Sequence, residues 1–241
     1  MPVYFFVSAL IAEIIGTLAG FGSSTIFLPL ALLFFDFPSA LVLVAFLHVF
    51  GNIGRVSFFR HGLDRRLLLH FGLPSIFLTI VGASLVAYLP QELLKGLLGL
   101  FLVIYSLLFL WRADLRIRPT LANSIIGGGL SGFLAGLIGT GGALRGAFLS
   151  AFALPKDRYI ATAAAIAIAV DLTRLPIYLS QGFMPAGLYW YLPVLLVIAF
   201  AGSFIGRQIL ARIPQAAFRR LVLIAILTIG LKFAFELLQF L

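Results

Sequence analysis

The residues of this sequence that could do chemistry are ionisable side chains placed inside long apolar runs. Arg145, His48 and Glu13 each lie among hydrophobic and small residues. A charge in such surroundings is costly, so each of the three is a functional candidate by default. Arg145 could bind an anion, while His48 and Glu13 could carry a proton or bond a substrate. The alternative is structural, because Arg145 could pair with a carbonyl or carboxylate and the others with neighbouring helices.

Two further polar pairs share one spacing near the ends of apolar runs. Asn52 precedes Arg55 by three positions, and Asp171 precedes Arg174 by the same interval. Each pair could line an access path at its own end of the molecule. Equally, Asp171 and Arg174 could form a helical i,i+3 bridge, and Arg55 could extend its charged end towards water. The sequence leaves both interpretations open.

Two clusters of small and hydroxyl residues interrupt the apolar pattern. The first comprises Gly20, Gly22, Ser23, Ser24 and Thr25, and the second comprises Gly139, Thr140, Gly141 and Gly142. A new helix is expected after each cluster, and a helix N-terminus offers free N–H groups and a partial positive charge, which suit an anion. Glycines also permit close helix packing, which is the competing explanation. We predict that a small anion binds between the two tips, with Arg145 as its nearest fixed charge.

The composition indicates that these residues lie in a membrane. Of the 241 residues, 62% are hydrophobic and 10% are charged, which is too apolar for a water-soluble domain. At about 20 residues per crossing, the chain allows roughly eight to ten crossings and no soluble catalytic domain. The net charge of +9 is explained by cationic loops that orient a membrane protein, so no nucleic-acid partner is predicted. The expected partners are the lipid bilayer and a small anion.

Three matched motifs divide the chain into two similar halves. They are Gly16-x-x-Ala19-Gly20 with Gly132-x-x-Ala135-Gly136, Asn52-x-x-Arg55 with Asp171-x-x-Arg174, and Pro90-Gln91-x-x-x-Lys95 with Pro214-Gln215-x-x-x-Arg219. Three matches in order predict a repeat over 1–118 and 119–241. The first half would hold a broken hairpin over 2–35 and spans at 39–58, 67–88 and 92–111. The second would hold a hairpin over 121–154 and spans at 159–180, 187–210 and 216–240.

The basic residues select between two topologies. If each broken segment crosses the membrane once, six basic loop residues lie on one side and six on the other. If each instead enters and returns on the same side, eleven share one side and only Lys95 lies opposite. The eleven are Arg60, Arg65, Arg66, Arg112, Arg116, Arg118, Lys156, Arg158, Arg212, Arg219 and Arg220. The positive-inside rule favours the second topology.

This topology has three consequences. Each half has three full crossings, so the two halves are inverted relative to each other. Both termini lie on the periplasmic or extracellular side, and the apolar N-terminus is a retained membrane segment rather than a signal peptide. The short return arms suit re-entrant hairpins, since 12 residues reach only about 18 Å. The arm over 2–20 is almost long enough to cross by itself. The predicted fold is thus an all-α polytopic membrane protein built from two inverted repeats.

The glycine motifs also resemble those of a known family. Gly16-Thr17-Leu18-Ala19-Gly20-Phe21-Gly22, Leu134-Ala135-Gly136-Leu137-Ile138-Gly139-Thr140-Gly141-Gly142-Ala143 and Gly202-Ser203-Phe204-Ile205-Gly206 are similar to motifs of the TauE/SafE permeases, also called sulfite exporters. The resemblance covers nearly the whole chain. It implies a bacterial or archaeal cytoplasmic (inner) membrane, and export of sulfite or an organosulfur anion such as a sulfonate.

Two other classes of function compete with transport. A membrane-embedded enzyme would need a reactive constellation, but the sequence has no cysteine, no HExxH, no Gly-x-Ser-x-Gly and no clustered carboxylates. An assembly or signalling scaffold would need neither internal symmetry nor broken helices. No catalytic residue, cofactor or metal is therefore predicted. The sequence leaves open the anion, the coupling ion and the oligomeric state, for which a homodimer is one candidate.

Overall fold

The computed structural model is helical throughout the residues it describes, which are 2–19, 22–58, 62–112, 117–152, 154–210 and 215–240. The helices are α1 (Pro2–Ala19), α2 (Ser24–Ala31), α3 (Phe37–Phe58), α4 (Arg65–Leu67), α5 (Leu73–Leu85), α6 (Gln91–Trp111), α7 (Leu121–Ile138), α8 (Gly142–Ala151), α9 (Lys156–Ser180), α10 (Tyr191–Leu210) and α11 (Gln215–Phe240). A π-helical turn over Leu68–Gly72 joins α4 to α5, and 3₁₀ turns lie at Val86–Tyr88 and Ala186–Leu188.

Seven of the described helical segments are long and apolar enough to cross a membrane. They are Phe37–Ser57, Arg65–Tyr88, Gln91–Trp111, Leu121–Ile138, Arg158–Ser180, Ala186–Ile209 and Arg220–Phe240. Six of these coincide with the predicted spans, so the all-α polytopic class is confirmed. The seventh is α7, which the sequence assigned to a hairpin arm. Its 18 residues reach about 27 Å, close to the thickness of a bilayer core.

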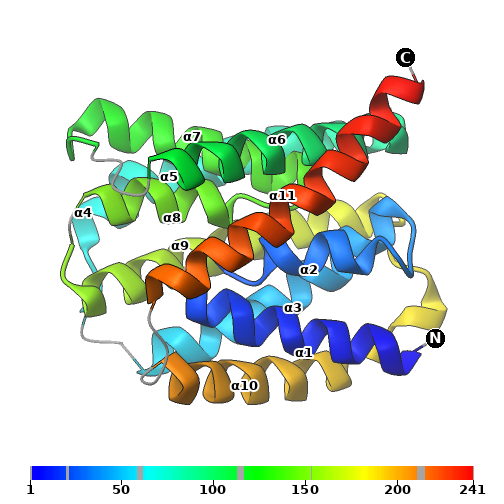
Figure 1. Cartoon of the computed structure of the whole chain (residues 1–241), viewed down its shortest axis with the longest axis horizontal. Coiled ribbons are helices and arrows are strands. Elements are labelled where there is room, and N and C mark those ends of the chain that lie inside the picture. Colours follow the sequence, from blue (N-terminus) through cyan, green and yellow to red (C-terminus); the bar gives the residue numbers. More distant parts are fainter. Residues whose placement is uncertain are drawn as a thin grey trace.

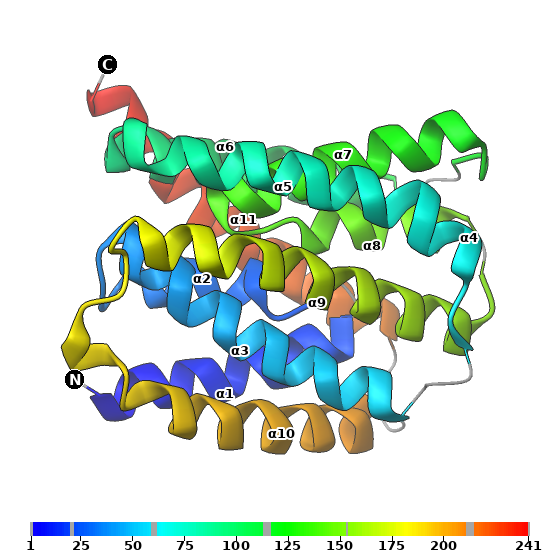
Figure 2. The same cartoon turned by 180° about the vertical axis from the view of Figure 1, so that it is seen from behind.

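Each of the two broken segments folds into a long helix followed by a short one. The short helices α2 and α8 have 8 and 10 residues, too few to cross a bilayer. Figures 1 and 2 show the α1–α2 hairpin opening at the end of the bundle where the N-terminus lies, and the α7–α8 hairpin opening at the opposite end. The two tips therefore approach the centre from opposite directions. That the halves are inverted repeats with a boundary near residue 118 stays a prediction.

The chain reverses at each tip through a glycine with a left-handed backbone. Gly22 has φ +86° and Gly139 has φ +72°, a region in which residues with a Cβ are strained. Gly139 also ends α7 as a left-handed cap, which releases the chain from the helix. The glycines at these two positions are thus required by the turn itself.

The helix ends sort into two groups along the bundle. The C-terminal ends of α3, α6, α8 and α10 and the first residues of α4, α7, α9 and α11 lie together, on the left of Figure 1. Eight of the eleven basic residues lie at or directly next to these ends, as the second topology expects: Arg65, Arg66, Arg112, Arg118, Lys156, Arg158, Arg219 and Arg220. The other three, Arg60, Arg116 and Arg212, lie outside the described residues. The N-terminus of α1 and the C-terminus of α11 lie at the other end. Which end faces the cytoplasm stays a prediction.

Close packing of α5 on α7 holds the second hairpin in place. A Cβ added at Gly128, Gly132 or Gly136 would collide with backbone atoms of α5 and the π-helical turn before it. Across the same interface the hydroxyl of Ser75 donates to the Gly128 carbonyl at 2.9 Å, and that of Thr79 donates to the Gly132 carbonyl at 3.0 Å. Small residues and interhelical hydroxyl bonds are the usual basis of helix association in membranes.

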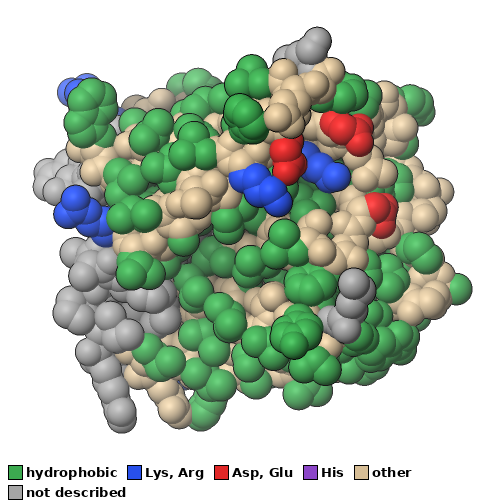
Figure 3. Space-filling view, turned by 45° about the vertical axis from the view of Figure 1, so that its right-hand side comes forward, with side chains coloured by type: hydrophobic (Ala, Val, Ile, Leu, Met, Phe, Trp, Pro, Cys, Tyr) green, Lys and Arg blue, Asp and Glu red, His purple; other side chains and the backbone are tan. Residues whose placement is uncertain are grey.

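The outer surface is apolar, as a lipid-facing surface must be. Large hydrophobic side chains such as Phe77, Val197, Leu221 and Leu238 are well exposed. Figure 3 shows a face covered mainly by hydrophobic side chains, with only a few acidic and basic ones. Five charged side chains, Glu13, Arg55, Arg145, Asp171 and Arg174, instead turn into the interior of the bundle, where they form the candidate site.

Candidate functional site

The two predicted tips meet in the interior. The Thr25 and Thr140 hydroxyl oxygens are 2.8 Å apart and hydrogen-bonded, although 115 residues separate them in sequence. Both side chains are fully buried, as are those of Ser23 and Ser24. The structure thus brings together the two hydroxyl clusters predicted from the sequence. Of the predicted tip residues, Gly20 lies outside the described part of the chain.

A helix N-terminus follows each tip. In α2 the N-cap residue is Ser23, whose side chain makes no capping bond, and its buried hydroxyl has no hydrogen-bond partner. In α8 the first helical bond runs from the Arg145 N–H to the Gly141 carbonyl. The N–H groups that precede these first bonds have no acceptor within their own helices. Two sets of free donors and two positive helix ends therefore lie near one another.

The tip glycines divide into two kinds by what surrounds them. A Cβ at Gly22 would lie 2.7 Å from Nε2 of His48, so this glycine faces a polar group. A Cβ at Gly139 would meet side chains of Leu28 and Leu41, and one at Gly141 would meet the backbone of α7. Gly141 therefore permits close packing within the hairpin. Gly142 begins α8 and is buried.

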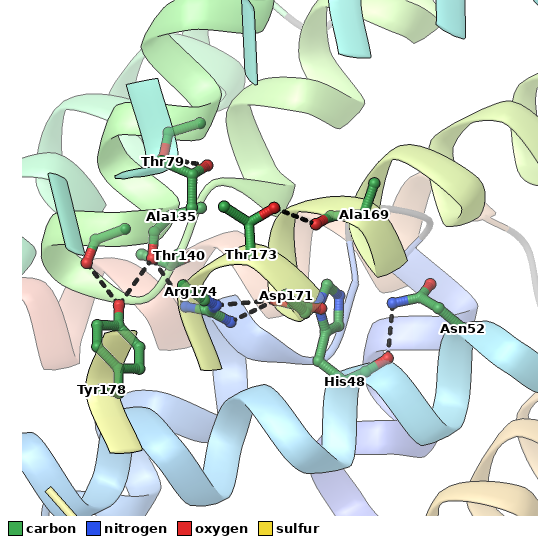
Figure 4. Close-up of polar contacts among 12 residues, drawn as sticks. His48, Asn52, Thr79, Ala135, Thr140, Ala169, Asp171, Thr173, Arg174 and Tyr178 are labelled. Carbon is green, nitrogen blue, oxygen red and sulfur yellow. Dashed lines mark hydrogen bonds and ion pairs between the residues drawn. The ribbon is translucent and has the colours of Figure 1, made fainter. Parts of the chain in front are cut away.

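A chain of buried polar groups crosses the centre between α3 and α9. Asp171 accepts from Nε of Arg174 at 2.9 Å and lies 2.7 Å from Nδ1 of His48 through its other oxygen. Figure 4 shows the His48 ring and the Arg174 guanidinium on either side of Asp171. Arg174 also donates to the Ala135 carbonyl at 2.7 Å, and the Tyr178 hydroxyl donates to the Gly136 carbonyl. The carbonyl end of α7 is thereby fixed to α9.

A second polar cluster lies between α1, α3 and α10. Arg55 donates to Glu13 at 2.6 Å, to Thr17 at 2.9 Å and to Asn52 at 3.0 Å. Glu13 is fully buried and also accepts from Ser203 at 2.8 Å. The Arg55 side chain is only 13% exposed, so it turns inward and does not extend towards water.

Arg145 differs from the other two interior arginines. It is 5% exposed on α8, and no described carboxylate lies within ion-pair distance of it. The charges of Asp171, Arg174 and Arg55 act on it through space. Among the described interior residues, two carboxylates, Glu13 and Asp171, face three arginines. One positive charge is therefore left without a counter-charge.

The structure settles several choices that the sequence left open. The i,i+3 bridge between Asp171 and Arg174 exists, and Arg55 is held by Glu13 and Asn52. Roles of these residues in access paths stay predictions, as do the proton-carrying roles of Glu13 and His48. Among the described residues, no group of three histidine, cysteine, aspartate or glutamate side chains is placed to hold a metal.

Sequence reasoning missed three polar residues that complete the two clusters. Thr17 and Tyr178 each lie four positions after a predicted residue, Glu13 and Arg174, and so share its helix face. That spacing could have pointed to both. Ser203 stands in the third glycine motif, but nothing in its local sequence indicates that it bonds a residue of α1.

The family can now be assigned. The sequence model of the family described as "Sulfite exporter TauE/SafE" matches residues 5–233, nearly the whole chain. The protein belongs to the TauE/SafE sulfite exporter family. TauE/SafE proteins are membrane transporters and not enzymes, so the enzyme alternative is excluded and the resemblance drawn from the glycine motifs is confirmed. No curated protein matches the chain. Both clusters and both tips lie inside the matched range.

Proposed function

We propose that this TauE/SafE protein is a secondary transporter that exports a small oxoanion, sulfite or an organosulfur anion such as a sulfonate, across the inner membrane. The observation that carries the proposal is the surplus buried positive charge of Arg145 beside two helix N-termini. The anion would lie between Ser23–Thr25 and Thr140–Ala143. Every group of this site comes from one chain, so the site does not require a dimer.

Loss of hydration is the main cost of moving an anion into a membrane interior. An anion that leaves water loses its hydration shell, and within a membrane only protein donors can replace it. Free N–H groups of α2 and α8, the hydroxyls of Ser23 and Thr140 and the guanidinium of Arg145 are donors of this kind. The converse also holds, because a buried cation without a partner is costly and a bound anion offsets that cost.

Alternating access would use the contacts that join the two predicted halves. The Thr25–Thr140 bond joins the tips, and the His48–Asp171 bond joins α3 to α9. Transporters built from inverted repeats with broken helices open to either side when one repeat rocks against the other around a central site. Rocking of this kind would change both contacts, and it would also shift α7 against α5, whose close packing joins the two predicted halves.

Transport into sealed vesicles tests the proposal. Proteoliposomes carrying the full chain should accumulate labelled sulfite or a labelled small sulfonate, and unlabelled anion of the same kind should compete. Empty liposomes give the background, and a labelled cation and a labelled neutral solute give the class controls. Vesicles that move only cations or neutral solutes would show the proposal to be wrong.

A further inference from the structure

His48 presents its two ring nitrogens to two different surroundings. Nδ1 lies 2.7 Å from Oδ2 of Asp171, and an ionised carboxylate only accepts, so we assign the hydrogen to Nδ1. Nε2 is buried and has no hydrogen-bond partner. In the neutral ring Nε2 is then a bare acceptor, and in the protonated ring it becomes a donor.

The free nitrogen faces the first tip. A Cβ at Gly22 would lie 2.7 Å from Nε2, so only the absence of a side chain there leaves room beside the ring. The next residue, Ser23, has a buried hydroxyl that is also without a partner. Two unpartnered polar groups thus adjoin the N-terminus of α2, where we have proposed that the anion binds.

An anion at this tip would respond to the charge state of His48. With the ring neutral, the lone pair of Nε2 faces the anion and repels it. With the ring protonated, the same atom donates a charge-assisted hydrogen bond. We propose that His48 is a direct ligand of the transported oxoanion, and that the ring takes up one proton at Nε2 when the anion binds. This inference rests on the proposed function, since it concerns the same site.

The surrounding charges make the proton and the anion depend on each other. Burial of the ring disfavours a protonated His48, and so do the charges of Arg145 on α8 and Arg55 on α3, whereas Asp171 on α9 favours it. Arg174 on α9 is paired to Asp171, and Glu13 on α1 is paired to Arg55. Protonation alone would raise the surplus of this interior cluster from one positive charge to two. A doubly charged oxoanion bound with the proton would leave the cluster formally neutral.

Linkage gives a direct test. If protonation strengthens anion binding, anion binding must promote protonation by the same factor. The purified full-length protein is titrated calorimetrically with sulfate and with methanesulfonate, which both stay ionised from pH 6 to pH 8, in buffers of different ionisation enthalpy. The parent should take up about one proton per anion. Its affinity should rise as pH falls, by at most about tenfold per pH unit for one linked proton.

His48→Gln keeps a neutral side chain that can donate to Asp171. His70→Gln is the matched control, because His70 is also a histidine but lies in the π-helical turn before α5 and is not one of the proposed site residues. His48→Gln should bind anions with no proton uptake and no pH dependence, whereas His70→Gln should behave like the parent. Proton uptake that persists in folded His48→Gln, or parent binding without proton uptake, would overturn the inference alone. A parent that binds neither anion at any pH would overturn the proposed function itself.

Discussion

The two interior arginine clusters have similar designs but different partners. In each, an arginine near the end of a long helix bonds the residue three positions earlier. It also bonds the first helix of its own predicted half, α1 for Arg55 and α7 for Arg174. The first cluster takes its carboxylate from α1, as Glu13, and the second takes it from α9 itself, as Asp171.

The two clusters also differ in the side chain that bonds their carboxylate from the other predicted half. Glu13 is met by the neutral hydroxyl of Ser203, whereas Asp171 is met by the titratable ring of His48. The first cluster therefore has no histidine among its described members. The second has one, and it faces the tip where the anion is proposed to bind. If His48 binds the anion as proposed, the second cluster responds to protonation through a group that the first cluster lacks.

The largest effect should follow from removing the carboxylate of the second cluster, Asp171, which bonds His48 of α3 and Arg174 of its own helix. Asp171→Asn leaves Arg174 buried without a counter-charge, which costs about 3–5 kcal/mol of unfolding free energy. Ser203→Ala removes only the hydroxyl that reaches the first cluster from α10, with one hydrogen bond to Glu13, and should cost about 1 kcal/mol. Thermal unfolding of both variants in the same detergent measures the difference. Equal losses would show that the two clusters are equivalent anchors.

Making the first cluster resemble the second should weaken anion binding. Asn52→Asp adds a negative charge beside Arg55 and cancels the surplus positive charge of the interior. It also removes the bond from Asn52 to the His48 carbonyl, at a cost of about 1 kcal/mol. We expect at least a severalfold loss of anion affinity by calorimetry. Asn123→Asp, at an exposed hydrogen-bonded asparagine on α7, is the control. Unchanged affinity in folded Asn52→Asp would argue against the role of surplus charge.

Arg145 should contribute to binding more than to folding. Arg145→Ala should weaken anion binding by more than about 1 kcal/mol, the scale of a charge-assisted hydrogen bond. Because Arg145 is a buried cation without an ion pair to a described carboxylate, its loss should leave the melting temperature of the anion-free protein unchanged or raise it. Arg145→Lys should recover activity only in part, since an ammonium lacks the planar two-point geometry. Folded Arg145→Ala protein that transports like the parent would assign Arg145 a structural role.

The smallest perturbation, a terminal reporter fusion, tests the membrane topology on which the two predicted halves depend. A reporter fused after α11 should signal a periplasmic C-terminus, because the positive-inside rule places the eleven basic residues in the cytoplasm. Fusions in the basic segment between α6 and α7 should give the opposite signal. A cytoplasmic signal from the C-terminal fusion would remove the basis for two inverted halves, and with it the relation between the clusters.

Much of the architecture could be predicted because it depends on local properties of the chain. Composition places so apolar a sequence in a membrane, and crossing length gives the six long spans. The two glycine clusters mark both tips, where Gly22 and Gly139 take positive φ. The three-residue spacing brings Asp171 to Arg174 on one helix face. The sequence did not predict that α7 is long enough to cross by itself, because it assigned residues 121–154 as a whole to a re-entrant hairpin.

The polar connections across the bundle were decided only by the tertiary structure. His48 and Asp171 are 123 residues apart, Thr25 and Thr140 are 115 apart, and Glu13 and Ser203 are 190 apart. In a soluble protein the apolar face of a helix indicates which side is buried. In a membrane protein both the lipid and the interior accept apolar residues, so that signal is weak. Which face of α3 turns towards α9, and hence which nitrogen of His48 is left free, follows only from how the helices pack.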